Sequence, residues 1–254
     1  MTRAIGAAVM MMLGGACLRL VVGGGYVDYV KDLMYWPLLL SGVVLSVLGA
    51  VGLLRETSPG RAALASAGHA GHGHGHGEPR VAWLLLVPVL AVYVVPPPAL
   101  GADSIDRSSA RVAEPLSPYG PLPEDGPVAL TVREFVERAV YDTSGALEDR
   151  EVVLTGFAVP AGEAAQGGPS AEEVPVGGAD AAFTLARVSM FCCAADGYAF
   201  TVDVTGTDTA PAPDTWLEVR GTLVPIEGEP DPYTVPVLDA SSVTVVERPA
   251  NVYE

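Results

Sequence analysis

The sequence predicts an α-helical membrane anchor of three transmembrane helices followed by a mainly-β domain, a small oligonucleotide-binding-like (OB-like) barrel with one flanking helix. Half of the 254 residues are hydrophobic and only 17% are charged, whereas soluble domains carry about 25% charge. Residues 1–101 contain six basic and four acidic residues, but residues 102–254 contain eight basic and 26 acidic residues, a net charge of −18. Long apolar runs fill the first part, and short alternating segments fill the second.

The composition also excludes several classes of protein. Nucleic acid is not expected as a partner, because phosphates require a basic surface and the β half is strongly acidic. Three cysteines are too few for a disulfide framework in a chain of this length. A membrane protein with an acidic domain in water fits both halves, with membrane lipid as its first partner.

Three apolar runs are candidates for the anchor, since a bilayer core of about 30 Å needs roughly 20 helical residues. Residues 4–22 contain one charge, Arg19, near the end of the run, and residues 34–54 contain none. Residues 81–95 are also uncharged but would span only about 22 Å as a helix. The first run has two other interpretations, a cleaved signal peptide or a lipoprotein signal at Cys17. Apolar residues continue beyond Cys17, which favours a retained helix.

The positions of the arginines predict the orientation of the anchor. Arg3 precedes the first run, and Arg55, Arg61 and Arg80 lie in the loop at residues 55–80. The positive-inside rule therefore places the N-terminus and this loop in the cytoplasm. With three spans, the chain is a multi-pass protein of the cell membrane whose acidic domain is extracytoplasmic. If the third run does not span the membrane, the acidic domain lies on the cytoplasmic side instead.

All four histidines of the chain lie in the cytoplasmic loop, separated by glycine and alanine: His69, His72, His74 and His76. Neutral imidazole binds transition metals, and glycine spacers let several imidazoles converge on one ion. The expected ion is zinc or another transition metal such as cobalt or nickel. The alternative is a polar linker whose histidines have no role. Catalysis is not expected, because no rigid second shell orients the ligands.

The second half is predicted to be a domain at residues 128–254, preceded by a Pro/Gly-rich linker at residues 101–127 that is extended and solvated. Residues 131–142 predict a helix with a capping box formed by Thr131 and Glu134. The period then changes to two, which predicts short strands. These strands are expected at residues 151–160, 183–193, 198–206, 215–225, 233–238 and 242–247. That number of strands suits an OB-like barrel.

Cys192, Cys193 and Asp196 form the most chemically specific cluster of the β half. The Asp196-Gly197 pair is typical of a turn, so the two cysteines lie where a strand enters a loop. Three interpretations remain open: structural thiols, a thiolate–carboxylate metal site, or a redox pair. A disulfide between adjacent residues would be strained, because their Cα atoms are about 3.8 Å apart. No histidine lies in this half, which excludes Cys-His and Ser-His-Asp catalysis within the domain.

The layout of the chain resembles the YcgQ-like family of bacterial permease subunits. The resemblance rests on the two spans, the histidine loop, the third span and the motif residues of the β domain. Those residues are Arg187, Phe191, Cys192, Cys193, Ala194, Asp196, Trp216, Val219, Gly221 and the segment from Pro249 to Tyr253. The resemblance implies an integral membrane component paired with a separate multi-span permease, with a link to metal homeostasis.

The sequence thus predicts a non-enzymatic accessory subunit of a permease that takes part in transition-metal handling. A second hypothesis is an extracytoplasmic thiol protein, either redox-active or metal-binding, that uses Cys192 and Cys193. In that hypothesis the histidine segment is only a linker.

Overall fold

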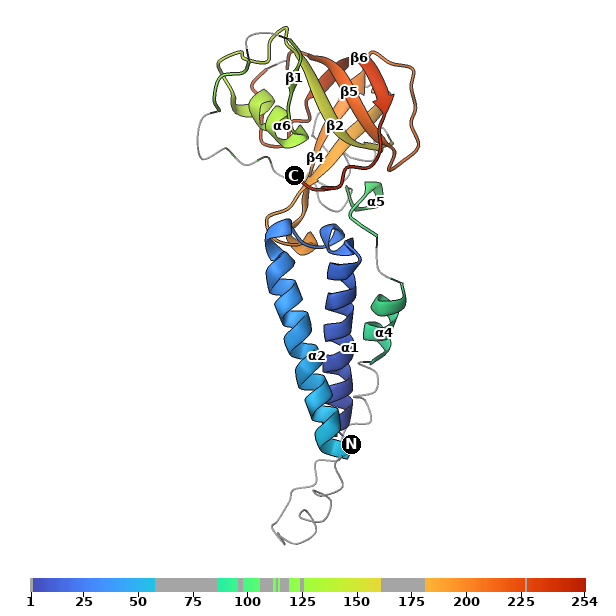
Figure 1. The fold of residues 1–254 in the computed structure, drawn as a ribbon. Coiled ribbons are helices and arrows are strands. Elements are labelled where there is room, and N and C mark those ends of the chain that lie inside the picture. The colour runs from blue at the N-terminus through green and yellow to red at the C-terminus, as the bar shows by residue number, and fades with distance from the viewer. Residues whose placement is uncertain are drawn as a thin grey trace, which may run out of the picture. The chain divides into compact units, whose positions relative to one another are not determined.

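The computed structural model describes residues 2–57, 86–95, 98–105, 126–160, 181–226 and 228–254, with residues 112, 114 and 119–123 between them. Two compact units divide the chain, Met1–Pro98 and Ala99–Glu254, and each is described by itself. The first is helical and the second is built around a β-barrel (Figure 1).

Helices α1 (Thr2–Val22) and α2 (Tyr35–Thr57) lie side by side in the first unit. Both are long and apolar enough to cross a membrane. Small residues line their contact: a Cβ added at Gly14 would lie 2.5 Å from the Ser46 hydroxyl, and one at Gly49 would lie 2.7 Å from the Ala7 carbonyl. Glycine at such positions lets the backbones of membrane helices approach closely. Most of the large apolar side chains of α2 are exposed instead of packed on α1.

The third predicted span is not confirmed. Its described part is helix α4 (Leu86–Val94), and residues 81–85 lie outside the described residues. Nine helical residues extend about 13 Å, which is less than half of a bilayer core. Helix α4 nevertheless packs against α1. The Arg19 guanidinium lies 5.1 Å from the centre of the Tyr93 ring and donates a hydrogen bond to the Tyr93 carbonyl.

The second unit confirms the predicted OB-like barrel. Its elements are β1 (Val128–Ala129), α6 (Val132–Tyr141), β2 (Glu151–Val159), β3 (Phe183–Ser189), β4 (Tyr198–Thr205), β5 (Trp216–Leu223) and β6 (Val237–Val245). The strand order is β1-β2-β3-β4-β6-β5, and an antiparallel pairing of β2 with β5 closes five strands into a barrel. Strands β4 and β6 are parallel, whereas the other neighbours within the barrel are antiparallel.

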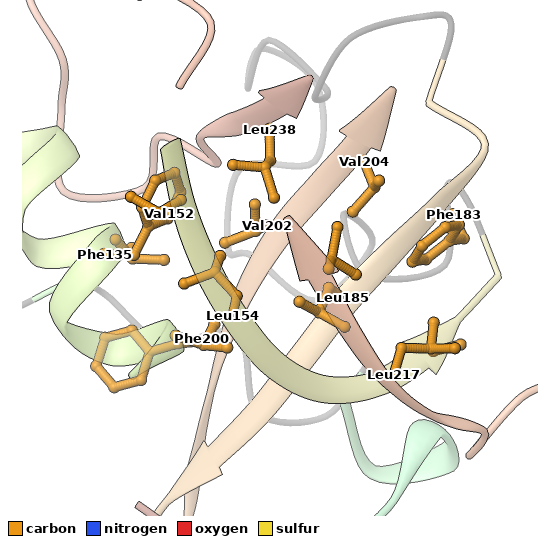
Figure 2. Packing of buried hydrophobic residues seen from close by; sticks show 14 of the residues in the cluster. Phe135, Val152, Leu154, Phe183, Leu185, Phe200, Val202, Val204, Leu217 and Leu238 are labelled. Atoms are coloured by element: carbon orange, nitrogen blue, oxygen red, sulfur yellow. The ribbon is translucent and has the colours of Figure 1, made fainter. Parts of the chain in front are cut away.

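The predicted flanking helix is also present, as α6. Thr131 is its N-cap and accepts a hydrogen bond from the Glu134 N–H at 3.0 Å, as the capping pattern predicts. Phe135 on its buried face joins side chains from β2 to β6 in the barrel interior (Figure 2). Alternation along the strands directs these residues inward, so the period-two pattern of the sequence corresponds to the barrel core.

A second apolar layer covers the outer face of β2, β3 and β4. Ile105 from the short helix α5 (Ala102–Ile105), together with Val252 and Tyr253, packs there against residues such as Val188. The Leu100 N–H donates to the Tyr253 hydroxyl at 3.0 Å. Strand β3 is consequently buried on both faces. The segment expected to be a solvated linker therefore contributes to the domain, and Val112 from it is buried in the main core.

Two strand boundaries differ from the prediction. Strand β3 ends at Ser189 and does not continue to Cys193. Strand β6 begins at Val237 and joins the end of the segment predicted at residues 233–238 to most of the segment predicted at 242–247, with an irregular register opposite Arg220 and Gly221, whereas residues 233–236 are not strand. Ala240 pairs with Gly221 and Ser242 pairs with Arg220, so Ser241 is an extra residue. Such a bulge reverses the alternation of side chains, which makes one strand resemble two in the sequence.

Candidate metal centre

The loop between β3 and β4 brings together the three candidate residues of the β domain. It runs from Met190 to Gly197 and contains one short 3-10 turn, Ala194–Asp196, labelled η4. Cys193 is the N-cap of this turn, and Cys192 precedes it. The cysteines therefore lie at the exit of a strand, as predicted, but neither has a ladder partner in β3 or β4.

Asp196 shapes this loop by accepting three backbone hydrogen bonds. Its Oδ1 accepts the Phe191 N–H at 2.8 Å, and its Oδ2 accepts the N–H groups of Cys192 at 2.9 Å and Cys193 at 3.2 Å. In return, the Cys193 sulfur accepts the Asp196 N–H, which completes a capping box. Strand β3 ends before the cysteines because this carboxylate holds their N–H groups away from the ladder.

The loop places two thiols and one carboxylate within reach of one ion. The two Sγ atoms and an oxygen of Asp196 all lie within 4.8 Å of one another. Cys192 and Cys193 are both free thiols of intermediate exposure. Among the residues that the structure describes, this is the one group of three His, Cys, Asp or Glu side chains with such spacing. Thiolate and carboxylate are both established ligands for transition metals.

Hydrogen bonding within the loop raises the pKa of the Cys192 thiol and lowers the pKa of the Asp196 carboxyl group. A hydrogen bond from Cys192 to Asp196 is the main factor that raises the pKa of the Cys192 thiol to about 12. The same bond, with the three backbone N–H groups, lowers the pKa of Asp196 to about 2. The metal-free loop at neutral pH therefore holds a charged carboxylate and a neutral Cys192 thiol. A metal that binds Cys192 must displace its proton.

The four histidines, His69, His72, His74 and His76, lie outside the described residues. Their expected metal affinity stays a prediction. They belong to the first unit of the chain, whereas the cysteine loop belongs to the second.

Sequence reasoning missed a buried polar cluster beside the candidate loop. The Glu254 carboxylate accepts the N–H groups of Val132 and Arg133, both at 3.0 Å, at the N-terminus of α6. The Arg187 guanidinium lies 3.7 Å from this carboxylate and 4.7 Å from the centre of the Trp216 ring. The resemblance includes Arg187 and Trp216, but no local pattern indicates that Glu254 reaches them.

A cavity of about 700 Å³ lies between the C-terminal part of α6 and strands β5 and β6. Carboxylates line it together with an apolar wall: Asp142, Glu148, Asp149, Asp239, Leu147, Leu223, Val224 and Ile226. Within the described part of the chain, its carboxylates do not form a group with metal-binding spacing. Its residues were not predicted, since the loop at 142–149 and strand β6 are far apart in the sequence.

Comparison with known proteins finds one family model that matches part of the β domain. Residues 176–254 match the DUF1980 C-terminal domain. The matched segment begins before β3 and includes the cysteine loop, β4, β5, β6 and Glu254. No curated protein and no solved structure matches the chain significantly.

Proposed function

We propose that the chain is a non-enzymatic, membrane-anchored metal-binding protein whose extracytoplasmic OB-like domain binds a transition metal through the β3–β4 loop. The observation that carries the proposal is the approach of Cys192, Cys193 and Asp196 to within 4.8 Å of one another. The loop is held by backbone hydrogen bonds and its thiols are partly exposed. An ion from solution can therefore reach ligands that are already close together.

Two features of the helical unit support a multi-pass anchor in the cell membrane. Helices α1 and α2 pack through small residues and expose apolar side chains, as expected for contact with lipid. Helix α4 packs beside α1, where Tyr93 contacts the charged end of the first span through Arg19. This contact favours the third span of the predicted topology, since it brings the ends of both helices to the same level. Three spans place the acidic domain outside the cell.

We also propose that the chain is an accessory subunit of a multi-span permease, as the resemblance to the YcgQ-like family implies. The DUF1980 C-terminal domain match supports this resemblance over the β domain. A nucleic-acid partner is not proposed. The outer face of β3 and β4, which OB folds use for oligonucleotides, is covered by residues 99–105 and 251–254.

The thiol site is tested by metal protection of cysteines in the full chain in detergent. We expect at least one of Cu(I), Zn(II) and Co(II), each added singly, to protect two thiols per chain from an alkylating reagent, because bound thiolates are not free nucleophiles. Mass spectrometry of the labelled peptide that contains residues 192 and 193 measures this. The Cys17→Ser variant is the matched control and should retain the protection.

Two outcomes contradict the proposal. Labelling of both thiols at the same rate with each of the three metals would remove the metal site. A gain of two reactive thiols only after addition of a reductant would favour the alternative, in which Cys192 and Cys193 are a redox pair.

The histidine segment gives an independent prediction. Replacing His69, His72, His74 and His76 with alanine is expected to abolish retention of zinc, cobalt or nickel by the cytoplasmic loop, because the imidazoles are its expected ligands. Retention on a column loaded with each metal measures this, in a full chain that also carries Cys192→Ser and Cys193→Ser so that only the histidine segment is tested. Replacing Gly71, Gly73, Gly75 and Gly77 with alanine keeps every imidazole and serves as the control. Equal retention in the two variants would assign the histidines to a simple linker.

A further inference from the structure

We propose that the loop selects a soft monovalent ion, Cu(I), which the two thiolates bind alone, and that Asp196 is a positioning residue and not a ligand. This inference rests on the proposed function and specifies its ion. It starts from the number of donor atoms that the loop leaves available for a metal.

The carboxylate of Asp196 is already engaged. Its Oδ2 accepts two backbone N–H groups, those of Cys192 and Cys193, and its Oδ1 accepts that of Phe191. A carboxylate offers about four lone-pair positions, and three are used by the loop backbone. One position, on Oδ1, remains, and a metal bound there would weaken the N–H hydrogen bonds that fix the positions of the two thiols. Coordination by Asp196 would therefore loosen the arrangement that makes the site.

The two thiols are close enough to each other to bind the same ion. A metal–thiolate bond is about 2.3 Å long, so two sulfurs on opposite sides of one ion lie about 4.6 Å apart. The Sγ atoms of Cys192 and Cys193 are within 4.8 Å of each other. The two sulfurs are therefore near enough for one ion to bind both.

The loop lacks the ligands that zinc requires. Structural zinc sites use four protein ligands, and catalytic sites use three and a water. The remaining residues of the turn, Ala194 and Ala195, have methyl side chains, and no further His, Cys, Asp or Glu joins the cluster among the described residues. Thiolates favour Cu(I), and this ion is stable with two such ligands. Binding releases both thiol protons and leaves a dithiolate complex of charge −1.

The exposure of the site is consistent with ion transfer. Cys192 and Cys193 are partly exposed, and the neighbouring Phe191 is 88% exposed. A two-coordinate ion at the surface leaves room for a third thiolate to approach before one of the first two departs. The loop can thus exchange Cu(I) with a partner without unfolding.

The experiment uses the full chain in detergent with His69, His72, His74 and His76 replaced by alanine, so that only the loop is measured. Cu(I) is presented in competition with a coloured Cu(I) chelator, and Zn(II) with a zinc indicator. We expect one Cu(I) per chain, tighter binding of Cu(I) than of Zn(II), and loss of binding in Cys192→Ser and in Cys193→Ser. X-ray absorption at the copper edge should show two sulfur neighbours and no oxygen.

The Asp196→Asn variant separates positioning from ligation. We expect it to bind Cu(I) with the same two-sulfur spectrum and an affinity lowered by about 10-fold, the effect of a group that orients ligands. Asp208→Asn, in the loop after β4, removes one exposed carboxylate elsewhere and should leave the affinity unchanged. An oxygen neighbour in the wild-type spectrum, or zinc binding tighter than that of Cu(I), would overturn the inference while leaving the proposed function intact. Failure of both metals to bind would overturn the proposed function itself.

Discussion

Replacing Gly221 with alanine is expected to destabilise the barrel by about 3 kcal/mol, the upper part of the range for overpacking a core. A Cβ at this buried position of β5 would lie 2.2 Å from the Asp239 carbonyl oxygen and 3.0 Å from the Ala240 Cα. Both are backbone atoms of β6, so neither can rotate away. The clash falls next to the Ser241 bulge, where the two strands already depart from regular pairing.

Amide hydrogen exchange measures this effect in the full chain, since local opening of β5 and β6 reports their free energy without isolation of the domain. We expect faster exchange throughout the barrel, because β5 pairs with both β2 and β6. Gly120→Ala is the matched control, as a Cβ there meets no atom within 4 Å. Equal protection in the two variants would contradict this prediction, because it would mean that β5 and β6 accommodate the added Cβ without loss of stability.

Helices α1, α2 and α6 and most strands of the chain could be predicted because each is encoded by a local pattern. The apolar runs gave α1 and α2, the cap at Thr131 gave α6, and alternation gave the barrel strands. Prediction from alternation failed at the Ser241 bulge, since the bulge changes which face each side chain occupies within one strand. The contact between Leu100 and Tyr253 joins residues 153 positions apart, and no local pattern could indicate it.

The candidate site, too, could be predicted only as far as local patterns in the sequence indicate it. Cys192, Cys193 and Asp196 are within five positions of one another, so their proximity could be predicted from the turn that follows them. The role of Asp196 as an acceptor of backbone hydrogen bonds could not be predicted from the sequence. Whether a carboxylate ligates a metal or accepts backbone N–H groups depends on the dihedral angles of the loop, and a sequence pattern does not define these.

The buried pair of Arg187 and Glu254 gives the second large expected effect. Both side chains are 9% exposed. Among the described residues, the Nε of Arg187 is a buried side-chain nitrogen without a hydrogen-bond partner. Burial raises the pKa of Glu254 and lowers that of Arg187, so desolvation outweighs their attraction at 3.7 Å. Removing one partner of such a pair is strongly destabilising, because it leaves an uncompensated buried charge.

Glu254→Gln is expected to cost about 3 kcal/mol of barrel stability at neutral pH. The Arg187 guanidinium keeps its proton at neutral pH, so its unpaired charge cannot be relieved. The double variant Arg187→Met/Glu254→Gln should be more stable than Glu254→Gln alone, since it removes that charge. Hydrogen exchange of β3 provides the measurement. The prediction would be contradicted if the double variant lost as much stability as the two single variants combined.

Arg187→Met should behave differently with pH, because the carboxyl group that it leaves behind can titrate. Without the guanidinium, the pKa of Glu254 rises further above its value in the unfolded chain. A folded-state pKa that is raised gives stability that is complete below the unfolded pKa and is lost as the pH rises through the folded pKa. The deficit of Arg187→Met relative to the wild type is therefore expected to be larger at pH 8 than at pH 5. A deficit independent of pH would show that the N-terminus of α6, through the Val132 and Arg133 N–H groups, is sufficient to hold the charged carboxylate.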